Sequence, residues 1–320
     1  MSRAERARRE DRLVKLQAAR VHYNLQSGFK VARRKRRPPP TPWPDHGLPP
    51  PAIEEGMLVL KEGSVVIFDD WSLDLVCLVR FTPFADMPPG MLTDIAWVTG
   101  TLVGDALGET VVVKGGEASG ACCSGAGCMV GGGKGVDCGM APGKEEAALK
   151  WATKQGKKVQ RVEEFYSERF ENMSAVLFAQ MAGEVVESGG LGALPIEVDL
   201  KLDDVFAPLV NYSEAPIPTR LHQDTDANTY TYGFFAPIHA AHKESGVFKG
   251  TPATRESGFE STGGHLVLQS YGVALDFTAC DGVVDVLWRC KDDVHGVMES
   301  QYAEGFSRFV SVVRTFGCRL

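Results

Sequence analysis

The chain has 320 residues, of which 44% are hydrophobic and 23% charged, a composition typical of a globular protein with an ordinary buried core. No apolar run approaches the roughly 20 residues that a membrane-spanning helix needs, and no apolar segment follows the charged N-terminus, which argues against a membrane protein and a secretory signal. Eight cysteines without regular spacing favour reduced thiols in an intracellular protein over a disulfide framework.

Charge is distributed unevenly along the chain. The formal net charge is −7, yet residues 1–37 carry 13 Lys and Arg against 3 Asp and Glu, a net of +10, which leaves −17 for the remainder. A basic arm on an acidic body often marks contact with nucleic acid or nuclear import, and a solvated, disordered tail explains it equally well. A nuclear location is the expectation that follows from the arm.

The arm has two parts. Residues 2–25 have the composition of a helix with a thin apolar stripe. The basic cluster at residues 33–37 then runs into prolines that recur up to Pro51, which predicts an extended, solvated linker. We therefore expect a basic, proline-rich arm and linker over residues 1–52 and a folded domain over residues 53–320.

The domain begins with short β-rich runs. MLVL (57–60), SVVIFD (64–69) and LDLVCLVRF (73–81) are predicted strands, and residues 91–107 a helix. Residues 115–143 are rich in Gly and Cys and predict a loop or disordered insertion. The four cysteines there have neither a C-x-x-C pair nor a nearby histidine, so an insertion is favoured over a zinc site.

Helices are predicted next and strands after them. Residues 145–187 have helical periodicity, with a break expected near Gly156, and the chain is strand-like from residue 191 onward. The strongest runs are TYTYGFFAPI (229–238), GVVDVLWR (282–289) and SRFVSVVRTF (307–316). Helices followed by a strand-rich half indicate an α+β domain whose sheets carry the functional site.

One ordered series of residues indicates iron chemistry. His222 and Asp224, in RLHQDTD, point the same way if the segment is extended, and His295 follows a predicted strand 73 residues after His222. Two imidazoles and one carboxylate form the facial site of non-haem Fe(II) oxygenases, which leaves positions open for co-substrate and oxygen. Arg308, 13 residues after His295, opens a β-branched run and offers a two-point contact to the far carboxylate of 2-oxoglutarate.

The series resembles the 2-oxoglutarate/Fe(II) dioxygenases, and among them the TET/JBP-like enzymes that modify nucleic acids, with the greatest likeness to fungal forms. The segments that carry the resemblance are TRLHQDTDANTYTYGFF, STGGHLVLQSYGVALDF, VHGV and SRFVSVV. It covers roughly residues 211–315, about a third of the chain. It implies a double-stranded β-helix core of the jelly-roll or cupin-like kind with flanking helices, and identifies residues 53–320 as a dioxygenase domain.

The resemblance also implies roles for single residues. The implied iron ligands are His222, Asp224 and His295. Arg308 is the implied 2-oxoglutarate anchor, and Arg314 is its rival because the two residues share a strand face. The positions implied to touch the target base are Asp226 and Asn228.

The activity implied is oxidation of methylated bases in double-stranded DNA, above all 5-methylcytosine to 5-hydroxymethylcytosine and further, with Fe(II), 2-oxoglutarate and O2. The target nucleotide must be extruded from the duplex to be reached. Phe316 stands near the place where several relatives have a base-contacting histidine, so demethylation of 6-methyladenine stays open.

Two other classes of function stay open as well. A small-molecule or protein hydroxylase on the same scaffold would suit the −17 charge outside the arm. A catalytically inactive, transposon-derived protein that binds nucleic acid through its arm is opposed by the complete His/Asp/His/Arg set. Of the other histidines, we expect His265 to be a core or outer-sphere residue, and His239 and His242 to lie in a surface loop.

Overall fold

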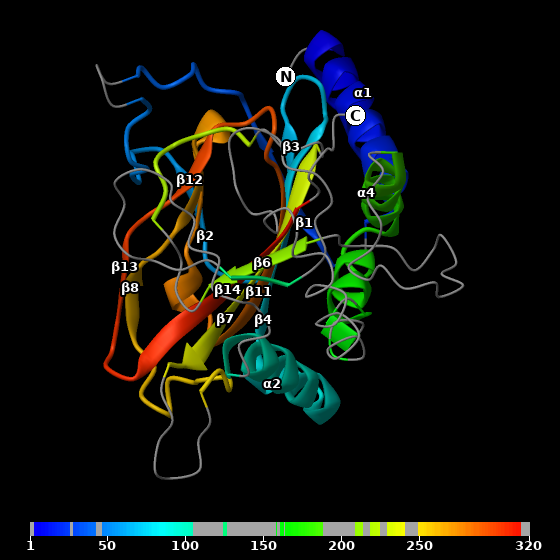
Figure 1. Cartoon of the computed structure of the whole chain (residues 1–320). Helices are drawn as coiled ribbons and strands as arrows, with labels where there is room; N and C mark the ends of the chain where they lie inside the picture. The colour runs from blue at the N-terminus through cyan, green and yellow to red at the C-terminus, as the bar shows by residue number, and fades with distance from the viewer. Residues whose placement is uncertain are drawn as a thin grey trace.

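The computed structural model describes residues 3–25, 28–42, 47–104, 124–126, 158, 161–162, 164–187, 209–213, 218–224, 229–240 and 249–314. Within these ranges the helices are α1 (Arg3–His22), α2 (Pro89–Gly104) and α4 (Ala175–Glu187), with helical residues also at 164–171 and 3-10 turns η1 (Phe84–Asp86), η3 (Gln269–Tyr271) and η4 (Phe277–Ala279). In Figure 1 the helices lie on one side of the strands.

The strands form two principal sheets. The major sheet has the order β1-β3-β4-β11-β7-β14-β6-β5, made of Lys30–Arg34, Ser64–Asp69, Leu75–Pro83, Gly282–Arg289, Tyr230–His239, Phe306–Arg314, Leu209–Ser213 and Ser124–Ala126. The minor sheet has the order β12-β9-β10-β2, made of His295–Val297, Leu266–Leu268, Val273–Leu275 and Leu58–Leu60. A separate pair joins β13 (Ser300–Tyr302) to β8 (Ser261–Gly263). Neighbouring strands are antiparallel except for β1 with β3 and β10 with β2.

The alternation of β11 shows how the sequence forms three layers. Val284, Val286 and Trp288 belong to the buried cluster between the major and minor sheets, whereas Val283 and Leu287 belong to the cluster between the major sheet and the helices. Successive strand residues point to opposite faces, so a strand that is apolar at both parities must be covered on both sides. The helices therefore cover one face of the major sheet, and the other face lines the interior of a β-sandwich.

The helix layer contains one buried ion pair. Arg169 donates two hydrogen bonds to the carboxylate of Asp285, at 2.9 and 2.5 Å, and the Tyr232 hydroxyl donates to the same carboxylate at 2.5 Å. Burial alone would lower the pKa of Arg169, but the Asp285 charge outweighs burial and raises it. This pair joins the helical residues at 164–171 to the centre of the major sheet.

The basic cluster is not the solvated linker that the sequence predicted. Residues Lys30–Arg34 form β1, which pairs in parallel with β3. The Arg34 guanidinium donates to the carbonyls of Tyr271 and Gly272 at 3.1 Å, and Arg37 forms an ion pair with Glu54 at 2.8 Å. Hydrogen bonds to backbone carbonyls and pairing with acidic groups of the body hold this segment in place. The division of the chain at residue 52 stays a prediction.

The α+β architecture with a double-stranded β-helix core is confirmed. The predicted strands at 57–60, 64–69, 73–81 and 282–289 correspond to β2, β3, β4 and β11. The helix expected over 91–107 is α2, and that expected over 2–25 is α1. The expected break near Gly156 and most of the Gly/Cys-rich insertion lie outside the described residues, although β5 falls within the insertion. No helix in the described ranges has the length and apolarity to cross a bilayer.

Candidate active site

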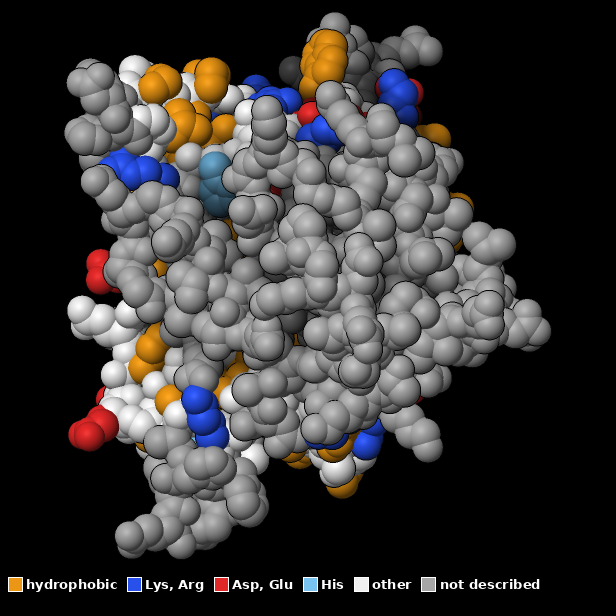
Figure 2. Space-filling model, viewed as in Figure 1, with side chains coloured by type: hydrophobic (Ala, Val, Ile, Leu, Met, Phe, Trp, Pro, Cys, Tyr) orange, Lys and Arg blue, Asp and Glu red, His pale blue; other side chains and the backbone are white. Residues whose placement is uncertain are grey.

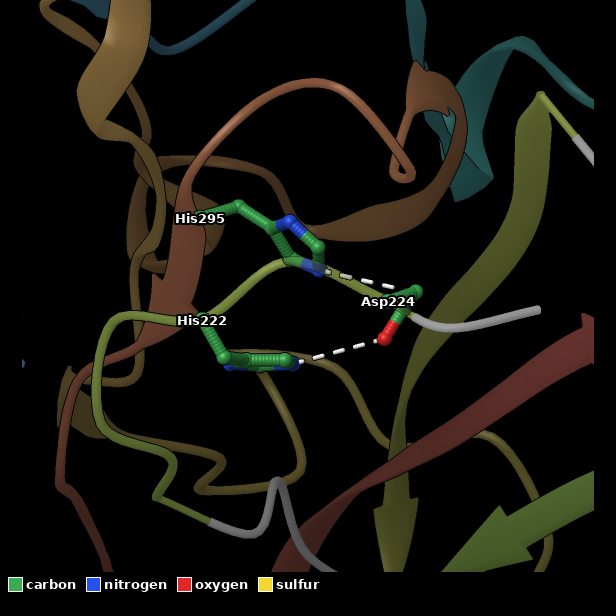
Figure 3. A group of neighbouring side chains, drawn as sticks. All are labelled: His222, Asp224 and His295. Carbon is green, nitrogen blue, oxygen red and sulfur yellow. Dashed lines mark ion pairs between the residues drawn. The ribbon is translucent and has the colours of Figure 1, made fainter. Parts of the chain in front are cut away.

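His222, Asp224 and His295 lie together, as the sequence predicted. Each offers one ligand atom, and these atoms all lie within 4.8 Å of one another. Figure 3 shows both imidazoles directed at the Asp224 carboxylate, with His222 Nε2 at 3.5 Å from Oδ1 and His295 Nε2 at 3.6 Å from Oδ2. The side chains of Asp224 and His295 are buried, whereas that of His222 is 36% exposed, so the group opens to solvent on the His222 side.

The backbone fixes this arrangement. His295 is the first residue of β12, and His222 pairs with it as an isolated antiparallel bridge at the edge of the minor sheet. Two residues later the Asp224 N–H donates to the carbonyl of Cys290, which directly follows β11 of the major sheet, at 3.0 Å. The H-x-D segment thus crosses from the minor sheet to the major sheet.

Hydrogen bonds set the tautomer of both histidines. His222 Nδ1 lies 2.8 Å from the Arg220 carbonyl, and His295 Nδ1 lies 3.0 Å from the Asp293 carbonyl. A carbonyl oxygen only accepts, so each Nδ1 carries a proton, and in the neutral form of each ring the Nε2 lone pair lies on the side of Asp224. Two neutral imidazole nitrogens and one carboxylate form the donor set that a non-haem Fe(II) site uses.

The interior beside His295 is apolar and tightly packed. The Trp288 ring lies edge-on to the His295 ring at a centroid distance of 5.9 Å, and no hydrogen-bond partner for its Nε1 is found among the described residues. The backbone at Gly296 is crowded, since a Cβ there would lie 3.1 Å from the carbonyl oxygens of Thr219 and Arg220. The H-x-D segment therefore lies so close to β12 that a side chain at residue 296 would force it outward.

Arg308 projects into the same sandwich interior from β14. It is 2% exposed, and its guanidinium lies over the rings of Phe259 and Phe277 at 5.4 and 5.8 Å. Its Nη2 donates to the Ser261 hydroxyl at 3.2 Å, whereas its buried Nη1 has no hydrogen-bond partner in the described part of the chain.

The charge of Arg308 is not neutralised by any ion pair among the described residues. Burial lowers the pKa of Arg308, because its charged form is poorly solvated there. A buried cation is costly unless an anion accompanies it. The surroundings of Arg308 therefore suit a carboxylate ligand that accepts from Nη1, and the C5 carboxylate of 2-oxoglutarate is of this kind.

His265 is not a member of the His222/Asp224/His295 group. Its Nε2 lies 3.4 Å from Asp276 Oδ1, and Lys61 pairs with the other oxygen of Asp276 at 3.6 Å. Burial alone would raise the pKa of Asp276, but hydrogen bonds from Thr278 and the positive neighbours hold it below its usual value. The expectation of an outer, structural histidine therefore agrees with its position.

Some sequence expectations are corrected or lie outside the described residues. His239 was expected in a surface loop, but it ends β7 and is 5% exposed, because β7 continues through Pro237. Asp226, Asn228 and His242 lie outside the described residues, and so does the side chain of Arg314.

The comparison with protein families gives the same chemistry. The family model described as the Tet-like 2OG-Fe(II) oxygenase superfamily matches residues 136–300, more than half of the chain. The chain belongs to the Tet-like 2OG-Fe(II) oxygenase superfamily. Its cofactor is Fe(II), and its co-substrates are 2-oxoglutarate and O2. No curated protein matches the chain.

Several residues around the candidate site of this Tet-like oxygenase could not be predicted from the sequence. Ser261, Phe259 and Phe277 surround Arg308, and the turn Asp292–Asp293 supports the histidines, yet none stands in a recognisable spacing with them. The one available signal was the cluster Asp292-Asp293-Val294-His295, in which polar residues interrupt a strand directly before a ligand.

Proposed function

We propose that His222, Asp224 and His295 hold Fe(II) and that Arg308 binds the C5 carboxylate of 2-oxoglutarate. The observation that carries the proposal is a converging His/Asp/His group and a buried, uncompensated guanidinium within one sandwich, in a member of the Tet-like 2OG-Fe(II) oxygenase superfamily. Fe(II) with 2-oxoglutarate and O2 supplies the oxidising power, and the protein supplies binding and orientation.

The residues of the chain divide this work. The Arg220 and Asp293 carbonyls accept the Nδ1 protons, so that each neutral ring would offer its Nε2 to the metal, and Asp224 adds the negative charge that a divalent cation favours. The Arg308 guanidinium fixes the far end of the co-substrate, while Phe259 and Phe277 keep water from it. His222, the exposed member of the group, marks the side from which the substrate enters.

We further propose that the substrate is a methylated base in double-stranded DNA, above all 5-methylcytosine, oxidised to 5-hydroxymethylcytosine and further, and that the protein acts in the nucleus. The likeness to TET/JBP enzymes and the basic N-terminal segment support this substrate. Figure 2 shows the described Lys and Arg side chains at both ends of this face, not gathered in one patch. We assign the phosphate contacts chiefly to α1, because it carries 7 Lys and Arg against 3 Asp and Glu.

The deciding experiment compares substrates under identical conditions. Purified protein, Fe(II) and 2-oxoglutarate are incubated with matched duplexes containing 5-methylcytosine, 6-methyladenine or neither, and the nucleosides and succinate are quantified by mass spectrometry. The proposal expects oxidised cytosine products from the first duplex only. Products from 6-methyladenine would replace the base assignment, and succinate release without any base product would favour a hydroxylase of other substrates. Asp224→Ala is the control for activity of the site.

A further inference from the structure

We propose that Arg36 is a positioning residue for the metal centre, through which the N-terminal basic segment holds both chain segments that carry the candidate iron ligands. The inference rests on the proposed function of His222, Asp224 and His295. It concerns a residue 186 positions before the first ligand, outside the range of the family match.

The contact to the second histidine runs through Asp293, which is 1% exposed. Arg36 Nη2 lies 3.3 Å from Asp293 Oδ1, and Arg289 Nε donates to Oδ2 at 2.7 Å. The backbone carbonyl of the same residue accepts the Nδ1 proton of His295 at 3.0 Å. Two guanidinium groups therefore clamp the residue that orients the His295 ring.

The contact to the H-x-D segment runs through Asp292. Its backbone carbonyl accepts from Gln223 Nε2 at 2.8 Å and also from Arg36 Nη2. Gln223 stands between His222 and Asp224, so this carbonyl ties their segment to the turn that precedes His295. Arg36 Nη2 thus donates to the same carbonyl that links the H-x-D segment to the turn before His295.

Arg36 is itself held by the body of the protein. Arg34, two residues before it, ends β1 and is bonded to the carbonyls of Tyr271 and Gly272, and the Arg37 N–H donates to the Ser270 carbonyl at 2.7 Å. The Ser270 hydroxyl in turn accepts from the N–H of Val294 at 2.8 Å. The side chain of Arg36 is 51% exposed, but its backbone is held on both sides, so its contacts cost side-chain freedom without ordering a loop.

Outer-sphere partners of this kind orient metal ligands, and their loss typically weakens metal affinity by roughly 10- to 100-fold. We expect about a tenfold loss for Arg36→Ala, near the lower limit of that range, because Arg289 still holds Asp293. Lys35→Ala is the matched control: it removes one positive charge from the adjacent exposed position, and no contact of Lys35 with the 292–293 turn is found in the described structure.

The test uses the full-length protein and Co(II) as the metal probe. The dissociation constant and the visible absorption of bound Co(II) are measured for wild type, Arg36→Ala, Lys35→Ala and Asp224→Ala, with thermal unfolding of each metal-free protein as the fold control. We expect weaker Co(II) binding and an altered Co(II) spectrum in Arg36→Ala, and wild-type values for both in Lys35→Ala. Equal affinities and spectra for Arg36→Ala and Lys35→Ala would overturn it.

Two further comparisons cover a variant that fails to fold and a wrong assignment of the metal centre. If Arg36→Ala does not fold, Arg36→Gln is compared with Lys35→Gln, and equal Co(II) affinities of that pair overturn the inference. If wild type and Asp224→Ala bind Co(II) alike, the proposed metal centre itself is wrong. A difference between wild type and Asp224→Ala, without one between Arg36 and Lys35 variants, contradicts only the role of Arg36.

Discussion

His222 and His295 hold one another by their backbones. The N–H of His222 donates to the carbonyl of His295 at 2.8 Å, and the N–H of His295 donates to the carbonyl of His222 at 2.9 Å. Residues directly opposite in an antiparallel pair project their side chains to the same face, which brings the ring centroids to 4.5 Å. The spacing of two ligands 73 residues apart in sequence is thus set by a pair of hydrogen bonds.

Removing a candidate ligand should abolish turnover without unfolding the protein. We expect background succinate release from His222→Ala, Asp224→Ala and His295→Ala, because each variant lacks one of the three protein ligands of the facial set. Circular dichroism and thermal unfolding of the metal-free variants check that the fold persists. Wild-type turnover by iron-loaded Asp224→Ala would show the assignment to be wrong.

Gly296→Ala should weaken metal binding although residue 296 is no ligand. The added Cβ would lie 3.1 Å from the Thr219 and Arg220 carbonyls and must push the segment bearing His222 outward by a few tenths of an ångström. About a tenfold loss of Co(II) affinity is expected, as for other disturbances of a ligand's surroundings. The control is Gly100→Ala in α2, where a Cβ meets no atom within 4 Å and helix propensity favours Ala. Equal Co(II) affinity in both variants would contradict the steric argument.

Arg308→Lys should raise the 2-oxoglutarate requirement. An ammonium cannot reproduce the two-point contact of a guanidinium, and losing one charge-assisted hydrogen bond of roughly 1.5–3 kcal/mol corresponds to about a 10- to 100-fold rise in the concentration for half-maximal rate. Titration of 2-oxoglutarate in Arg308→Lys and Arg314→Lys decides between the two anchors. If the 2-oxoglutarate requirement rose in Arg314→Lys and stayed at the wild-type value in Arg308→Lys, Arg314 would be the anchor instead.

His265 should make stability depend on pH below neutrality. Burial lowers the pKa of His265 from its ordinary value of 6.5, against the attraction of Asp276 and with the help of Lys61 and Arg308. The folded protein then binds fewer protons than the unfolded chain, so stability is lost as pH falls through 6.5. Urea unfolding at pH 7.5 and 5.5 should show a larger loss in wild type than in His265→Gln. The same loss in both proteins would refute the prediction.

Phosphate contact by α1 is testable without disturbing the sheet. Replacing Arg6, Arg8, Arg9 and Arg12 by Gln should flatten the salt dependence of duplex binding by up to about 0.9 in log–log slope for each lost contact, and base preference should persist. Deletion of residues 1–53 is unsuitable, because it also removes β1 and Arg36. An unchanged slope would leave nuclear import as the explanation of the basic charge.

The sequence was most informative where the chemistry depends on order along the chain. The proximity of His222, Asp224 and His295 was predictable, because a double-stranded β-helix brings these residues together from fixed places in its strand order. Their roles and that of Arg308 stay proposals. The apolar run at residues 282–289 likewise predicted a strand, and the structure shows this strand buried on both faces.

The features that could not be predicted depend on contacts between segments that are distant in the sequence. A run such as KVARR has no apolar alternation, so its membership of the sheet follows only from the free edge of β3 beside it. His239 was misplaced because proline usually ends a strand, whereas Pro237 is tolerated in β7. The support of His295 by Arg36 joins residues 259 positions apart, a separation that no local pattern reports.

The two outermost strands of the major sheet come from the two least regular parts of the sequence. β1 belongs to the basic N-terminal segment and β5 to the Gly/Cys-rich insertion. Without them β3 and β6 would each present a row of unpaired N–H and C=O groups, which invites pairing with another chain and aggregation. The exposed charges of Lys30 and Arg33 on β1 discourage such pairing at the new edge. The basic segment and the insertion thereby cover two sheet edges that would otherwise favour self-association of the enzyme.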